Sequence, residues 1–198
     1  MDDQAMQTHP LDRTKLELGK KSPRFTNDTL HARLKHATRA EHDIVDRSLS
    51  QFDLAHTDSY FAFLCLNREA LALLRPHWRH ADCPDFNSMA QSLKADLATM
   101  GRIPSTVATP QQGPINSLGL AYVVRGSRLG SKILRRRVGP GLPTAYLDFE
   151  PELPWPELLQ ELETLAGAGP EAEAAIIAGA RATFAVYAQL SRIVGGLT

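Results

Sequence analysis

Three polar side chains, spaced three and four residues apart, form the first group in this sequence that could do chemistry. Lys35, Thr38 and His42 lie within LKHATRAEHDIVD. In an α-helix, this spacing places all three on one face over two turns. A neutral imidazole binds transition metals, and a lysine about 10 Å away along the helix could meet an anionic group. Iron at one end and carboxylates at the other describe a heme, although solvated side chains satisfy the same spacing.

Two glycines inside a helical pattern form the second group. Gly126 and Gly130 lie within YVVRGSRLGSKILRRRV, where Ser127 and Ser131 are their neighbours. Each glycine inside a helix costs about 0.5–1 kcal/mol relative to alanine. A helix that keeps two of them usually gains a close approach of its backbone to another helix or to a flat ligand, and they also permit a kink. The spacing by itself favours helix packing.

Basic side chains form the third group. Arg181 lies among small apolar residues in AGARATFAVYAQL, where it could neutralise a carboxylate at the rim of a pocket or remain an ordinary surface arginine. A basic run follows the glycine pair and consists of Lys132, Arg135, Arg136 and Arg137. Such a run could dock an acidic partner, or it could be a solvated helix end that complements the helix dipole.

The elements that must position these residues are helical. N-cap candidates at residues 26–28 begin a helix that should extend to about Phe52. Periodicity, prolines and glycines predict further helices at about residues 57–74, 87–100, 115–138, 155–166 and 170–194. No segment alternates like a strand. The sequence therefore predicts a single all-α domain over residues 26–198, preceded by a flexible polar tail at residues 1–25.

Composition limits the functional classes. The 198 residues suit one domain with a full core. Because 22 basic residues balance 22 acidic ones, no overall field favours nucleic acid or an anionic membrane. Cys65 and Cys83 form no CxxC pair, which argues against a zinc ribbon and a redox dithiol. We interpret them as two free thiols, with a single disulfide between them as the alternative. The N-terminus lacks a secretory signal and no apolar run could span a bilayer, so we expect a cytoplasmic protein.

Two segments resemble known signatures. LKHATRAEHDIVD is similar to the proximal-helix signature of heme oxygenases, L-K-x-A-T-x-x-x-H-x-x-[AV]-[ED], which it matches at Leu34, Lys35, Ala37, Thr38, His42, Val45 and Asp46. YVVRGSRLGSKILRRRV resembles the distal-helix signature of bacterial members, Y-V-x-x-G-S-x-L-G-[GA], starting at Tyr122. GPGLPTAYLDF followed by Trp155 is similar to the bacteriophytochrome-associated subgroup. The resemblance covers roughly residues 30–194.

The resemblance implies a fold and an activity. Members of the family are single helical domains that hold heme between the proximal and distal helices. They open the porphyrin with O2 and electrons from an external donor, such as a reductase or ferredoxin, to give biliverdin, CO and ferrous iron. The subgroup further implies a bacteriophytochrome as acceptor of the biliverdin. A non-catalytic heme carrier or sensor, or a helical interaction protein that has lost heme, would share the same features.

The resemblance also implies roles for individual residues. His42 matches the iron ligand, and Lys35 matches a lysine that pairs with a heme propionate. Gly126 and Gly130 match the glycines that let the distal helix pass close to the heme. Arg181 falls where the family carries another basic residue for a propionate, and Thr38 and Tyr122 belong to the two signatures that would contact heme.

Three positions depart from the family pattern. Ser127 stands where animal members carry an aspartate that organises distal water. Ser131 replaces a glycine or alanine and crowds the distal face slightly. Arg125 replaces an acidic residue that is common in the subgroup, and the sequence assigns it no role.

Overall fold

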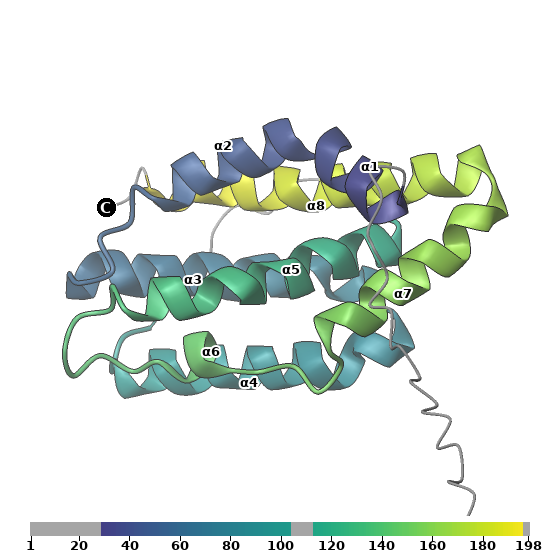
Figure 1. The fold of residues 1–198 in the computed structure, drawn as a ribbon. Coiled ribbons are helices and arrows are strands. Elements are labelled where there is room, and N and C mark those ends of the chain that lie inside the picture. Colours follow the sequence, from purple (N-terminus) through teal and green to yellow (C-terminus); the bar gives the residue numbers. More distant parts are fainter. Residues whose placement is uncertain (1–28, 104–112, 196–198) are drawn as a thin grey trace, which may run out of the picture.

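The chain folds into helices. The computed structural model describes residues 29–103 and 113–195, and these contain no strand (Figure 1). The α-helices are α1 (Leu30–Ala37), α2 (Arg39–Leu49), α3 (Thr57–Leu74), α4 (Cys83–Thr99), α5 (Ser117–Arg135), α6 (Ala145–Asp148), α7 (Trp155–Leu165) and α8 (Pro170–Gly195). Short 3-10 turns are η1 (Arg75–His77), η2 (His80–Asp82) and η3 (Ala166–Ala168). The predicted all-α class is confirmed, whereas the predicted tail lies outside the described residues.

The helices stack in three layers (Figure 1). Helices α2 and α8 form one outer layer, α3 and α5 lie in the middle, and α4 with the short α6 forms the other outer layer. Helix α8 packs against α2 within its own layer and against α3 and α5 in the middle layer, so it joins these two layers. Helix α7 closes one end and contacts α1 and α5. Among the described residues, no helix is long and apolar enough to cross a bilayer.

The predicted first helix is two helices. The backbone leaves helical geometry at Thr38 (φ −105°, ψ 6°), which separates α1 from α2. Neither proline nor glycine marks this point, so the prediction of one continuous helix was wrong. Thr29 caps α1 by accepting a hydrogen bond from the Ala32 amide, and the proposed caps at residues 26–28 lie outside the described residues. Glu163 of α7 accepts the amides of Leu30 and His31 at 3.0 Å each, a favourable place for a carboxylate.

Other boundaries shift modestly. Helix α4 begins at Cys83, four residues before the predicted start, because Pro84 occupies its first turn. Helix α5 ends at Arg135 rather than Val138. Helix α6 was predicted as loop; four residues carry too little periodicity to be recognised. The helices at 57–74, 155–166 and 170–194 are confirmed to within one residue.

The N-terminal half of α5 is packed tightly on α8. Asn116 caps α5 by accepting the amides of Leu118 and Gly119 at 3.0 and 3.1 Å. A Cβ built on Gly119 would lie 2.2 Å from the carbonyl oxygen of Ile176, and one built on Gly179 would lie 2.6 Å from that of Asn116. Only hydrogen fits at both positions, so two glycines set how closely α5 approaches α8.

Candidate functional site

His42 presents an imidazole suited to metal binding. Its Nδ1 lies 3.1 Å from Oδ2 of Asp46, one helical turn later, and 57% of its side chain is exposed. We assign the Nδ1 proton to the side that faces the carboxylate, which leaves the lone pair on Nε2. Among the described residues, Nε2 has no hydrogen-bond partner. The ring lies edge-on to Phe184 of α8, with centroids 5.7 Å apart.

Lys35 lies on α1, whereas Thr38 lies at the break between α1 and α2, so the two are not on one continuous helix and they differ in availability. Lys35 is exposed, and no carboxylate among the described residues pairs with it. Thr38 is 3% exposed, and its hydroxyl donates to the carbonyl oxygen of Leu34 at 2.9 Å. Lys35 can therefore reach an anion, whereas the hydroxyl of Thr38 is committed to its own helix.

Arg181 holds the junction between α1 and α2. Its Nε and Nη2 donate to the carbonyl oxygen of Ala37 at 3.2 and 2.7 Å. Its Nε also lies 3.1 Å from Oε1 of Glu41, and Oε2 of Glu41 is buried with no hydrogen-bond partner. An anion that approached Arg181 would compete with Glu41 for the guanidinium. Arg181 therefore lies beside the face of Lys35 and His42, but it is already engaged.

The two predicted glycines of α5 differ in their surroundings, and neither lies close to the backbone of another helix among the described residues. A Cβ on Gly130 would meet nothing within 4 Å, and one on Gly126 would meet only the ring edge of Trp155, at 3.4 and 3.5 Å. Leu129 and Ile133, which lie near the glycines on the helix, are 62% and 65% exposed. We call Tyr122, Gly126, Leu129, Gly130 and Ile133 the α5 strip, because their spacing places them along one side of the helix.

An aromatic cluster closes one end of the α5 strip. The ring of Tyr122 lies 6.0 Å from His31 of α1 and 5.5 Å from Trp155 of α7. Burial lowers the pKa of His31, with a further contribution from Lys35, and burial raises the pKa of Tyr122. The cluster joins α1, α5 and α7, and it brings the helix that leads to His42 beside the helix that carries the glycines.

Ser127 lies next to the α5 strip. It follows Gly126 by about 100° around the helix, and its hydroxyl donates to the carbonyl oxygen of Val124 at 2.7 Å. Ser131 is buried, and its hydroxyl lies 3.4 Å from the carbonyl oxygen of Ser127. Both hydroxyls are thus directed along their own helix.

A buried arginine, Arg125, attaches α5 to neighbouring segments on a side away from the α5 strip. Arg125 is 4% exposed, forms an ion pair with Asp82, and lies 3.6 Å from Asp85. It also donates to the carbonyl oxygen of Leu153. This arginine, to which the sequence assigned no role, connects α5 to the start of α4. Its acidic partners lie about forty residues away, so no local pattern could have revealed it.

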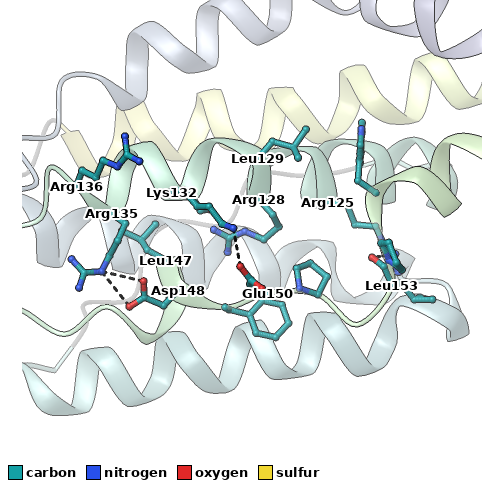
Figure 2. A pocket seen from close by; sticks show the side chains of 15 residues that line it. Arg125, Arg128, Leu129, Lys132, Arg135, Arg136, Leu147, Asp148, Glu150 and Leu153 are labelled. Carbon is teal, nitrogen blue, oxygen red and sulfur yellow. Dashed lines mark hydrogen bonds and ion pairs between the residues drawn. The ribbon is translucent and has the colours of Figure 1, made fainter. Parts of the chain in front are cut away.

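A cavity of about 480 Å³ adjoins this arginine side of α5, opposite residues 147–155 (Figure 2). Its described lining includes Arg128, Leu129, Lys132, Phe149 and Trp155. None of the residues predicted from the sequence as ligands or catalytic groups lines it. The cavity and the α5 strip are neighbours that share Leu129.

The predicted residues fall into two groups that α8 connects. Lys35, Thr38, His42 and Arg181 gather where α1 and α2 lie on α8, while Tyr122, Gly126 and Gly130 lie along α5, which packs on another part of α8. Within residues 29–103 and 113–195, no cluster of three or more His, Cys, Asp or Glu side chains could hold a metal ion. No protein-family model and no curated protein matches the chain.

Proposed function

We propose that this chain is a heme oxygenase that converts heme to biliverdin, CO and ferrous iron. The observation that carries the proposal is the α5 strip. Two glycines, each unfavourable in a helix, lie beside exposed Leu129 and Ile133; among the described residues, a Cβ on Gly126 would meet only the Trp155 ring and one on Gly130 would meet nothing within 4 Å. A planar apolar ligand resting on the strip would explain both the missing side chains and the exposed apolar ones.

The residues on the facing helices fit the chemistry of heme. An imidazole whose Nδ1 faces a carboxylate, and whose Nε2 has no partner among the described residues, would suit an iron ligand that is oriented by a second residue. Lys35 is exposed and has no ion-pair partner within the described part of the chain, so it would supply a cation for a propionate. Arg181 supplies a second one only if the propionate displaces Glu41 from it.

The residues of this chain would bind, orient and shield rather than perform acid–base chemistry. Bound heme supplies the iron that binds O2, and it is also the molecule that is opened. His42 would hold the iron, and the backbone at Gly126 and Gly130 would contact the porphyrin. Neither glycine offers a side-chain acid, and the hydroxyl of Ser127 donates to its own helix. Protons would therefore come through water held by backbone carbonyls.

The proposal includes partners. Electrons would come from a reductase or ferredoxin, and the basic run after the glycines offers a surface for an acidic one. Arg136 and Arg137 are exposed there, whereas Lys132 and Arg135 are already paired with Glu150 and Asp148. Biliverdin would pass to an acceptor such as a bacteriophytochrome.

The first test is a hemin titration followed by turnover. We expect wild-type protein to shift the Soret band and, with O2 and a reductant system, to produce a bilin spectrum. We expect His42→Ala to abolish bilin formation by removing the axial imidazole, while circular dichroism stays helical. His36→Ala is the matched control, because His36 is exposed on the neighbouring helix and should be dispensable.

Three outcomes would contradict the proposal. Undiminished bilin yield from His42→Ala would show that His42 is not the iron ligand. A stable heme complex that never yields bilin would indicate a carrier or sensor. No Soret shift on hemin addition would indicate a helical interaction protein.

A further inference from the structure

Arg128 is a buried cation without an acidic partner. The residue is 9% exposed, and its Nε is buried with no hydrogen-bond partner. Its Nη1 donates to the carbonyl oxygen of Tyr146 at 3.1 Å, and its guanidinium lies 4.6 Å from the centre of the Tyr146 ring. Among the described residues, no carboxylate lies within ion-pair distance of it. A buried charge left without a counter-charge is unfavourable, and an anion would relieve it.

The other cations of the cavity are satisfied or exposed, which distinguishes Arg128 from them. Arg125 has Asp82 and Asp85. Lys132 lies 2.9 Å from Glu150 and Arg135 lies 3.1 Å from Asp148, so these pairs join α5 to the facing segment (Figure 2). Both pairs are largely exposed, and such pairs open at little cost. They do not block access to Arg128.

The cavity has the size and lining of a small-molecule site. Its volume of about 480 Å³ falls within the range of roughly 300–1,000 Å³ that is usual for such sites. Apolar side chains form much of its wall, including Leu129, Leu147, Phe149 and Trp155. A site with one buried cation and apolar walls suits a molecule that carries an anionic group on an apolar body.

We propose that this cavity binds an organic anion whose carboxylate pairs with Arg128 and whose apolar part lies against Phe149 and Trp155. The site is separate from the proposed heme site, because His42, Lys35 and Arg181 are not among its described lining residues. Occupation of the two could still be linked, since Leu129 and Trp155 border both the cavity and the α5 strip.

The test compares two probes of equal size that differ in charge. Naphthalene-2-carboxylate and naphthalene-2-carboxamide are titrated into the full-length protein without hemin, and binding is followed by calorimetry and by Trp fluorescence. We expect the carboxylate to bind at least tenfold more tightly than the carboxamide. Inorganic phosphate, which has charge without an apolar body, should bind at least tenfold more weakly than the carboxylate.

Variants assign the preference to one residue. Arg128→Met should reduce the carboxylate affinity at least tenfold and leave the carboxamide affinity unchanged. Arg137→Met is the matched control, because Arg137 is exposed in the same basic run and is not among the described lining residues. His42→Ala should also bind the carboxylate normally, which separates this inference from the heme proposal.

Equal affinity of the two naphthalene probes for the wild type would overturn the proposal, and so would unchanged carboxylate affinity in Arg128→Met. Phosphate binding as tight as that of the carboxylate would overturn the role of the apolar walls. Should Arg128→Met fail to fold, Arg128→Gln takes its place. Glutamine removes the charge but keeps a polar side chain, so an unchanged preference for the carboxylate would then overturn the role of the arginine.

Discussion

The two halves of α5 use glycine for opposite purposes. In the first half, Gly119 lies so close to α8 that a Cβ would stand 2.2 Å from a backbone oxygen. In the second half, Gly130 has nothing within 4 Å of the position where a Cβ would be. The same residue type therefore permits helix contact at one place and leaves the helix uncovered at the other. A small-residue pattern in a sequence does not distinguish the two.

The second half of α5 is held in place by contacts at the start of the helix and on its other side. Gly119 and Gly179 seat the start of α5 on α8, whereas Arg125 and Arg128 reach from its other side to Asp82 and Tyr146. Along this half, a Cβ on Gly130 would meet nothing within 4 Å among the described residues, and Leu129 and Ile133 are largely exposed. An exposed apolar surface held on a fixed helix is typical of a binding surface.

The largest expected effect is on stability, and it should differ between glycine substitutions in the two halves of α5. We expect Gly119→Ala to lower the free energy of unfolding by about 2–3 kcal/mol, since the new Cβ can be accommodated only by moving backbone. Gly130→Ala, the matched control, should raise it by about 0.5–1 kcal/mol through helix propensity alone. Urea denaturation measures both. Equal effects at the two positions would show that the halves do not differ.

The next effect concerns ligand binding. We expect Gly130→Val and Gly126→Val to weaken hemin binding at least tenfold, because the added side chain projects from the surface that the heme should touch. Stability should change by less than about 1 kcal/mol for Gly130→Val, since space is open there. Absorbance titration of the Soret band measures the affinity. Wild-type affinity in both variants would contradict a ligand on the α5 strip.

The smallest effect concerns α1, which contacts Tyr122 of α5 through His31 and is tied to α8 by a surface ion pair. Arg33 donates to both carboxylate oxygens of Glu173 at 2.8 Å, which lowers the pKa of Glu173. Such a pair stabilises the fold above the unfolded pKa of the carboxyl, and its contribution is lost as the pH falls through the lowered, folded pKa. We expect Glu173→Gln to cost at most about 1 kcal/mol near neutral pH.

Urea denaturation of wild type and Glu173→Gln measures that cost at neutral pH and at about pH 3. The difference between the two proteins should shrink at the acidic pH. Glu171→Gln is a suitable control, because Glu171 is an exposed neighbour in the same first turn of α8. A difference that persists in acid would show that the ion pair is not its cause.

Much of the fold followed from local sequence signals. Apolar periodicity together with Pro76, Gly101 and Pro170 marked the helices now seen as α3, α4 and α8. The break at Thr38 was missed because no residue there disfavours a helix. We attribute the break to a residue that is remote in sequence, because the Arg181 side chain on α8 donates hydrogen bonds to the carbonyl oxygen of Ala37. Local propensity cannot report a hydrogen bond that spans more than 140 residues.

The candidate site was predicted unevenly for the same reason. Helix geometry predicted one face for Lys35, Thr38 and His42, but the structure places Lys35 on α1, His42 on α2 and Thr38 buried at the break between them. The engagement of Thr38 and Arg181 by the chain itself was not foreseeable. Trp155 beside Gly126 and the cavity around Arg128 depend on how α7 and residues 147–155 meet α5.

By itself the sequence determined the helical class, most helix ends, and the placement of His42 four residues before Asp46, because these depend on a repeat of 3.6 residues and on capping residues nearby. Only the tertiary structure decided which glycines of α5 touch another helix and which arginines are buried. Those properties depend on segments that are remote in sequence and adjacent in space.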